Sequence, residues 1–384
     1  MLFQEIKSEW GATAKKIVDE QLMPLSKEVD RNGRYDHRLM DYIKNAGLIA
    51  PTIAKEYGGI GLNERELNEV VREIARASTS AASMVTCQLM AAYGLLSPDG
   101  ASEEQKQRLL PKMASGELIA CPAITEEHAG SDVGGISTVA VKEGDHYVLN
   151  GEKALISHLG AADFFLVFAK TDPEKGNKGI TAFVVYTNNP GLTQGKPLRK
   201  MGQRGLDTGS LYLKDCIVPE SDRIGLEGKG MRICMALLNR SRLVMGSQAI
   251  GTATCAYEAA VDYAKKRMAF GKPLIAQQVI AFKLADMAIK LQTAQTAVNY
   301  AADKVDSGAT DFIFEVSASK VFASEMARDV INDAVQIHGG IGYTDEYPVE
   351  RCYRDQRVME IYGGATEVVK LVISRIISGE SKVR

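Results

Sequence analysis

Cysteine and histidine are scarce in this sequence, with six and five residues among 384. No two cysteines have CxxC spacing and the histidines form no HExxH motif, so we expect neither a disulfide framework nor a metal site. The chain also lacks an excess of one charge, because it has 46 Lys and Arg residues and 48 Asp and Glu residues. The net charge of −2 gives no field that would attract nucleic acid or an anionic membrane.

Long apolar runs are absent as well. The longest, 161–169, is interrupted by Asp163 and is far too short to span a bilayer. Residues 1–7 include Gln4, Glu5 and Lys7 and lack the apolar core of a signal peptide, so we expect a cytoplasmic protein. The 45% hydrophobic and 24% charged residues are typical of a globular chain. The length predicts roughly two to three domains.

Hydrophobic periodicity divides the chain into three parts. Residues 1–120 and 229–384 have apolar positions at three- and four-residue spacing, which predicts a helical domain and a helical bundle. Residues 121–228 contain short apolar runs separated by turn sequences, which predicts an antiparallel β-barrel or sandwich. The predicted helices cover 5–28, 37–46, 64–77, 103–114, 231–266, 278–306, 312–336 and 367–378. The predicted strands cover 138–141, 146–149, 164–169, 180–186 and 210–218.

Four segments combine glycine with polar or charged residues. They are 125–132, 267–273, 336–343 and 351–367. Each has a functional interpretation as a contact to a phosphate, a flat ring or a carbonyl oxygen, and a structural one as a capped turn or helix end. None is a GxGxxG motif between a strand and a helix, so a Rossmann site is not expected.

The order of these segments resembles the acyl-CoA dehydrogenase family over essentially the whole chain. The matching residues are Glu56-Tyr57-Gly58-Gly59-Ile60-Gly61-Leu62, Ile124-Thr125-Glu126, Ala129-Gly130-Ser131-Asp132, Asn150-Gly151-Glu152-Lys153, Arg267, Phe270-Gly271-Lys272-Pro273, Gln336, Gly339-Gly340, Tyr347-Pro348-Val349-Glu350-Arg351 and Arg354-Asp355. The resemblance implies an N-terminal helical domain, a middle β-domain and a C-terminal four-helix domain that enclose FAD. It also implies a homotetramer, built as a dimer of dimers.

The resemblance implies roles for particular residues. FAD would be contacted from the β-domain by Ile124, Thr125, Ser131, Ile156 and Ser157. The FAD of a neighbouring subunit would be contacted by Arg267, Phe270, Gln278, Gln336, Gly339 and Gly340, and Thr366 and Glu367 would lie by the adenosine half. The substrate would be contacted by Ser131, Arg242 and Gly363.

The activity that the resemblance implies is the α,β-dehydrogenation of an acyl-CoA thioester with a short or unusual acyl group. A carboxylate removes an α-proton while the β-hydride passes to flavin N5. The thioester oxygen accepts hydrogen bonds from a backbone N–H and a ribityl hydroxyl, which acidifies the α-carbon. The electrons would leave to an electron-transfer flavoprotein.

The carboxylate of this mechanism is missing from both positions where the family places it. The usual Tyr-Glu-Gly-Thr run here contains Gly363 in place of the glutamate, and the alternative position on an earlier helix holds Ser241. A second departure is 155–158, Leu-Ile-Ser-His, where the family usually has Trp-Ile-Thr-Asn. The catalytic residue is therefore unassigned by the resemblance.

Three explanations compete for the missing base. Another group could supply it, with Glu360, His158 and the segment 83–90 as candidates. Alternatively, an unusual thioester, including one on an acyl-carrier protein, could undergo chemistry that needs no such base, as in a desulfinase; oxygenase chemistry on the same fold is a related alternative. Finally, the protein could be a non-catalytic paralogue that binds in a complex.

Overall fold

The computed structural model describes residues 6–380 and contains a helical, a β and a second helical part in chain order. The α-helices are α1 Glu9–Ile17, α2 Met23–Asn32, α3 His37–Asn45, α4 Glu64–Ala77, α5 Thr79–Leu95, α6 Glu103–Ser115, α7 Gly230–Lys266, α8 Gln278–Asp306, α9 Ile313–His338, α10 Val349–Gln356 and α11 Thr366–Ile377. The strands are β1 Ala120–Ala123, β2 Val139–Glu143, β3 His146–Ser157, β4 Phe164–Lys170, β5 Ile180–Tyr186, β6 Leu192–Gln194, β7 Thr208–Pro219, β8 Arg223–Ile224, β9 Met268–Ala269 and β10 Lys272–Pro273.

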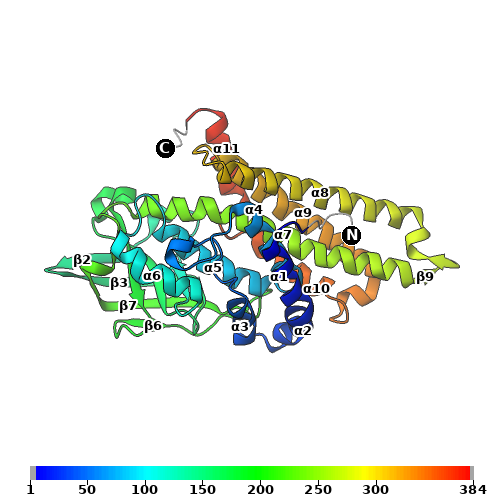
Figure 1. The fold of residues 1–384 in the computed structure, drawn as a ribbon, viewed down its shortest axis with the longest axis horizontal. Coiled ribbons are helices and arrows are strands. Elements are labelled where there is room, and N and C mark those ends of the chain that lie inside the picture. Colours follow the sequence, from blue (N-terminus) through cyan, green and yellow to red (C-terminus); the bar gives the residue numbers. More distant parts are fainter. Residues whose placement is uncertain (1–5, 381–384) are drawn as a thin grey trace.

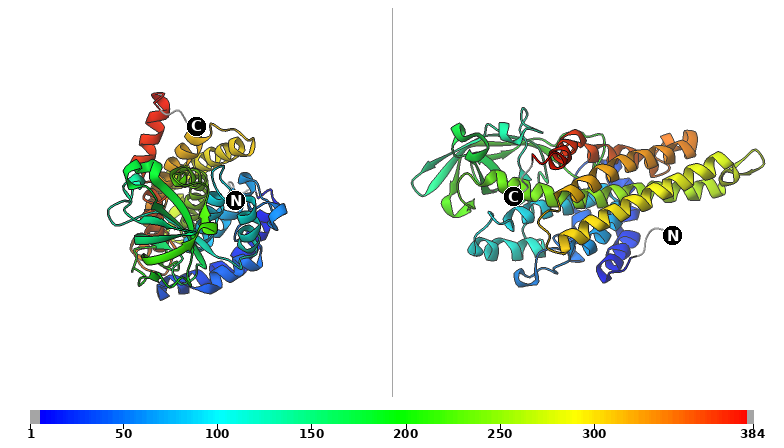
Figure 2. Two further views of the ribbon diagram at one scale, coloured as in Figure 1. Left: turned by 90° about the vertical axis from the view of Figure 1, so that its left-hand side faces the viewer. Right: turned by 90° about the horizontal axis from the view of Figure 1, so that it is seen from above.

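The molecule is elongated, with the large sheet at one end and the β9–β10 hairpin at the other (Figure 1). Helices α7, α8 and α9 run side by side between these ends, and the N-terminal helices pack along α7 (Figure 2). No helix within residues 6–380 combines the length and apolar character that crossing a membrane requires.

The predicted helices are present, with shifted ends. Residues 9–32 form α1 and α2 joined by the π-helical turn Val18–Leu22, and Glu5, where the prediction began, lies outside the described residues. Helix α6 is capped by Ser102, whose side chain accepts a hydrogen bond from the backbone N–H of Gln105 at 3.2 Å.

Helix α5 was not predicted. Within it only Cys87 and Met90 escape full burial, because α5 is surrounded by other helices and by the sheet. A helix that is buried on nearly every side carries no polar stripe, so the periodicity that reveals a surface helix is missing. This helix brings the segment 83–90 into the middle of the molecule.

Strand β4 contributes side chains to two hydrophobic cores, one on each face of the sheet. Its Phe164, Leu166 and Phe168 belong to the core shared with the N-terminal helices, whereas Phe165 and Val167 belong to the core on the opposite face. Such two-sided burial produces a continuous apolar run in the sequence instead of an alternating one.

The sheet has the strand order β6-β7-β3-β2-β4-β5-β8, with β1 paired to β4. Most pairs are antiparallel, as the turn sequences predicted, but β1 and β2 both run parallel to β4. The sheet is therefore mixed, since short apolar runs give no information on the direction in which a strand enters a sheet.

Candidate active site

The Gly363–Gly364 pair lies in the turn before α11, at the position where the family carries its base. Gly363 has a φ of +64°, in the left-handed region that residues with a Cβ rarely adopt. A Cβ on Gly363 would overlap the sulfur of Met245, a buried side chain of α7. The thioether of Met245 thus occupies the position that the Cβ of a catalytic side chain would need.

The backbone N–H of Gly363 has no hydrogen-bond acceptor among the residues that the structure describes. Its carbonyl oxygen faces Arg242, with 3.5 Å between that oxygen and Nε. The next carbonyl, of Gly364, accepts a hydrogen bond from Lys320 Nζ at 2.9 Å. The turn therefore holds both carbonyls close to buried cations, and the N–H of Gly363 is left available to a ligand.

A chain of hydrogen bonds fixes the residue before this pair. The Tyr362 hydroxyl donates to Gln248 Oε1 at 2.8 Å, and Gln248 Nε2 donates to the Ser83 hydroxyl at 3.0 Å. Ser83 then donates to Gln203 Oε1 at 2.8 Å, and the backbone N–H of Gln203 donates to the carboxylate of Asp355. Burial raises the pKa of Asp355 to about 6 and that of the Tyr362 hydroxyl above its usual range.

In the structure, the side chains of Ser241 and Glu360 are engaged in contacts other than those of a catalytic base. Ser241 is fully buried, and its hydroxyl donates to the Leu238 carbonyl within α7 at 2.9 Å. Glu360 accepts a hydrogen bond from Arg328 Nη1 at 2.7 Å and lies 3.7 Å from Arg357. The Glu360 carboxylate is therefore committed to ion pairs with Arg328 and Arg357.

His158 is fully buried, and its Nε2 lies 3.0 Å from the Met84 carbonyl oxygen. Since a carbonyl only accepts, the proton is on Nε2 and Nδ1 is left without a hydrogen-bond partner among the described residues. Burial lowers the pKa of the ring to about 4, although the Met84 carbonyl partly opposes this. The histidine is therefore neutral at pH 7, and its one resolved hydrogen bond ties β3 to α5.

Most of segment 83–90 serves packing or the hydrogen-bond chain, but Cys87 is partly exposed. The neighbouring Cys87 thiol, together with burial, raises the pKa of Cys121 well above its usual value, and the Ser157 backbone partly opposes this. Cys87 also lies close enough to Tyr362 that its charge would raise the pKa of that hydroxyl.

The segment with Ile124 and Thr125 lies beside the strand that carries Ile156 and Ser157. Backbone 124–125 runs beside β3, where the Ala154 N–H donates to the Thr125 carbonyl at 2.8 Å, and β3 ends with Ile156 and Ser157. Ser131 is exposed on the loop that follows Thr125.

Glu126 anchors this loop. Its two carboxylate oxygens accept hydrogen bonds from both the backbone and the hydroxyl of Ser137 and of Thr138, and from Lys153 Nζ at 2.7 Å. Burial alone would raise the pKa of Glu126, but the Lys153 charge and these hydrogen bonds lower it to about 2. The motif residues Glu126 and Lys153 are therefore structural supports of the predicted cofactor loop.

The residues predicted for a neighbouring subunit's FAD lie on or beside the β9–β10 hairpin, at the start of α8 and at the end of α9. The hairpin is at the opposite end of the molecule from the large sheet (Figure 1). There a cavity of about 870 Å³ is lined by Ala259, Asp262, Tyr263, Lys266, Arg267, Leu274, Ile337, His338, Gly339, Gly340, Ile341 and Tyr347. Nothing stands where a Cβ of Gly339 or Gly340 would be, so a ligand can approach the backbone closely. The buried Nε2 of His338 has no hydrogen-bond partner among the described residues.

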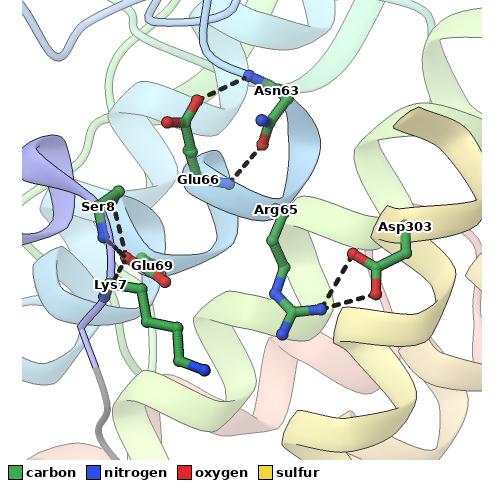
Figure 3. A pocket seen from close by; sticks show the side chains of 7 residues that line it. All are labelled: Lys7, Ser8, Asn63, Arg65, Glu66, Glu69 and Asp303. Carbon is green, nitrogen blue, oxygen red and sulfur yellow. Dashed lines mark hydrogen bonds and ion pairs between the residues drawn. The ribbon is translucent and has the colours of Figure 1, made fainter. Parts of the chain in front are cut away.

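A second hollow, of about 440 Å³, lies between α1, α4 and α8 (Figure 3). Arg65 Nη1 contacts Asp303 at 2.8 Å, and Glu69 accepts a hydrogen bond from the Ser8 hydroxyl at 2.8 Å. None of the predicted site residues lines this hollow. Its polar groups connect helices and form no part of the candidate active site.

Comparison with known proteins decides the family. Residues 5–117, 121–216 and 228–378 match the sequence models of the acyl-CoA dehydrogenase N-terminal, middle and C-terminal domains. The chain belongs to the acyl-CoA dehydrogenase family. It is accordingly an FAD-dependent oxidoreductase.

Three similar proteins show the extent of the match. The human mitochondrial short-chain specific acyl-CoA dehydrogenase is 40% identical over 94% of this chain and 87% of its own length. The 3-(aryl)acrylate reductase of Clostridium sporogenes is 39% identical over 97% of this chain and 99% of its own. The structure of butyryl-CoA dehydrogenase from Megasphaera elsdenii superposes with a TM-score of 0.93 at 36% identity, covering 96% of this chain and 97% of that one.

For a member of the acyl-CoA dehydrogenase family, the residues present fit FAD. The cavity at 339–340 offers two cations, Lys266 and Arg267, and open backbone for a dinucleotide's phosphates. The loop around Ser131 and the end of β3 offer hydroxyls and backbone to its flavin half.

Sequence reasoning missed Met245, Gln248 and Lys320. Lys320 had a detectable signal, because it stands at a core position of α9 between the buried Val316 and Ala323. A lysine in an apolar stripe is unusual and marks a buried charge. Met245 had no such signal, since its contact with Gly363 joins segments more than 100 residues apart.

Proposed function

We propose that this chain transfers hydrogen between FAD and the α,β-carbons of an acyl-CoA thioester with a short or unusual acyl group. The observation that carries the proposal is the unpaired N–H of Gly363, in a turn otherwise fixed by Tyr362, Arg242 and Lys320. That N–H is the donor expected for the thioester oxygen. Bound FAD supplies the hydride acceptor or donor at its flavin ring.

The proposed assignment of residues follows the two ends of the molecule. In one subunit Ile124, Thr125, Ser131, Ile156 and Ser157 hold the flavin half. A neighbouring subunit contributes Arg267, Phe270, Gln278, Gln336, Gly339 and Gly340, and Thr366 and Glu367 lie by the adenosine half. Support comes from Phe270, a residue that is 96% exposed at the tip of the β9–β10 hairpin. We therefore infer an oligomer, with the homotetramer as the expected form.

Reoxidation of the reduced flavin requires an electron acceptor, and the proposed acceptor is an electron-transfer flavoprotein. Either direction of the reaction suits the site, because the same N–H that acidifies an α-carbon also polarises an enoyl thioester. The reductase named among the similar proteins supports testing both directions.

The test uses the FAD-loaded protein under anaerobic conditions. Saturated acyl-CoAs of increasing length and the matching acyl-carrier-protein thioesters are added, and loss of the oxidised flavin absorbance is followed. In the reverse arm, enoyl-CoAs are added to the protein after reduction with dithionite. We expect at least one short thioester to change the flavin's redox state. If no thioester does so in either direction, the proposal is wrong.

We further propose that Cys87 transfers the α-proton. Of the three candidate sources of the base, Glu360 is bound by guanidinium groups, and His158 is buried and neutral. In the third, the segment 83–90, the Cys87 thiol is the ionisable group. It packs against the β-domain core that contains Ile156, and its helix α5 also carries Ser83 of the hydrogen-bond chain to Tyr362. Cysteine is among the side chains that serve as general acids and bases.

Cys87→Ala is expected to slow flavin reduction by a thioester about 100-fold, the lower end of the effect of a positioned acid or base. Cys216→Ala is the matched control, because Cys216 is a buried thiol on β7 and has no role in the proposed site. The measurement is single-turnover flavin reduction in a stopped-flow instrument as a function of pH. Equal rates for the two variants would show that the proton goes elsewhere.

A further inference from the structure

Two cations are buried beside the Gly363–Gly364 pair. Arg242 of α7 is 4% exposed and Lys320 of α9 is 1% exposed. Their hydrogen-bond acceptors are all neutral: Arg242 Nη1 donates to Asn239 Oδ1 at 2.9 Å and to the Ser317 hydroxyl at 3.1 Å, and Lys320 Nζ donates to the Gly364 carbonyl at 2.9 Å. Among the described residues, neither cation has a carboxylate within ion-pair distance.

Other buried cations of this chain are paired. Lys153 Nζ lies 2.7 Å from Glu126, and Arg76 Nε lies 3.1 Å from Glu73. A buried charge without a counter-ion costs several kcal/mol, so proteins rarely keep one without a use. Burial lowers the pKa of Arg242 to about 10, and burial together with the Arg242 charge lowers that of Lys320 to about 8.

The nearest carboxylates do not neutralise the pair. Glu360 and Glu367 are close enough to raise the pKa of Lys320 in part. However, Glu360 is bound by Arg328 at 2.7 Å and lies 3.7 Å from Arg357. Glu367 is exposed in the first turn of α11. The local charge therefore remains positive.

The two cations retain unused donors toward the turn. Arg242 Nη2 has no acceptor among the described residues and lies 3.6 Å from where a Cβ of Gly364 would be. Lys320 uses one of its three N–H groups. Residue 363 cannot supply an anion from this backbone while Met245 occupies its Cβ position.

We propose that Arg242 and Lys320 form an anion subsite for the acyl group, so that the substrate is an acyl thioester carrying its own carboxylate or comparable anion near the thioester. This inference rests on the proposed function, because it places the thioester at Gly363. The substrate's anion then occupies the region in which other members of the family place a glutamate.

The test compares succinyl-CoA with butyryl-CoA, which have the same chain length and differ in a terminal carboxylate against a methyl group. Binding to the FAD-loaded protein is measured by isothermal titration calorimetry and by perturbation of the flavin spectrum, and neither readout requires turnover. We expect succinyl-CoA to bind at least about tenfold more tightly. Lys320→Met should abolish that preference, Lys320→Arg should keep it, and Lys290→Met, which removes a surface cation from α8, should leave it unchanged.

The outcomes separate the two proposals. Equal binding of the two thioesters, unaffected by Lys320→Met, overturns the anion subsite even if butyryl-CoA reduces the flavin. If Lys320→Met weakens free CoA as much as succinyl-CoA, the cations bind the CoA part and the acyl assignment is wrong. Failure of every thioester to bind or to change the flavin overturns the proposed function as well. Thermal unfolding of each variant confirms that it is folded, and Lys320→Arg tests the charge if Lys320→Met is not.

Discussion

The double variant Met245→Ala/Gly363→Glu is expected to oxidise a saturated, uncharged acyl-CoA about 100-fold faster than the parent protein. A positioned base contributes roughly 10²–10⁴-fold, and the lower end applies because we assign part of that assistance to Cys87 in the parent. Removing the Met245 side chain matters because its sulfur occupies the position of the new Cβ. The buried Arg242 beside the turn would favour the ionised form of the new carboxylate.

Gly363→Glu alone should gain less. The Met245 side chain must move, and a residue with a Cβ at a φ of +64° costs about 1–2 kcal/mol. The matched control is Met245→Ala/Gly363→Ala, which has the same backbone strain and cavity but no carboxylate. Single-turnover flavin reduction with butyryl-CoA distinguishes them. Should the double alanine variant match the glutamate variant, the missing carboxylate is not what limits the parent.

Lys153→Met is expected to lower the free energy of unfolding by about 3–5 kcal/mol, since it leaves Glu126 as an uncompensated buried charge. Lys142→Met is the matched control, because the Lys142–Glu220 pair, at 2.9 Å, is largely exposed and should contribute less than about 1 kcal/mol. Urea unfolding of the FAD-loaded proteins at pH 7 measures both.

The Glu126–Lys153 pair should also make the free energy of unfolding depend on pH in the acid range. The pKa of Glu126 is about 2 in the folded protein and near 4.3 in an unfolded chain. Its contribution is therefore present above about pH 4.3 and is lost as the pH falls toward 2. Lys153→Met should show a flatter decline over this window. The double variant Glu126→Gln/Lys153→Met should recover much of the lost stability, and a double variant as unstable as Lys153→Met would contradict the charge argument.

The predictable parts of this fold have local signals. The apolar run of β4 and the caps of α6 could be located from neighbouring residues alone, as could the order of helical and β parts. Helix α5 could not, because its burial by distant elements removes the polar stripe. The parallel course of β1 and β2 beside β4 is likewise set by pairing between strands that are far apart in the sequence.

The candidate site divides in the same way. Motifs indicated the loop at Glu126 and the open backbone at Gly339–Gly340, and these segments do form supported or open surfaces. The sequence also showed that position 363 has no carboxylate. It did not show that Met245, from another helix, occupies the space that a side chain at position 363 would need. The proximity of Cys87 to Cys121 was hidden for the same reason, as no spacing in the sequence relates them.

Helix α7 has a consequence for how this chain can vary in length. Its 37 residues run without interruption from the sheet end to the β9–β10 hairpin; Arg242 and Met245 lie in its first half, and it leads into Arg267 at its C-terminal end. Arg242 and Arg267 are roughly 37 Å apart, at about 1.5 Å per residue. One inserted or deleted residue between them would rotate one end against the other by about 100°. Evolution can substitute residues along α7, but it cannot insert or delete one there without misorienting either the Gly363 turn or the distant cavity.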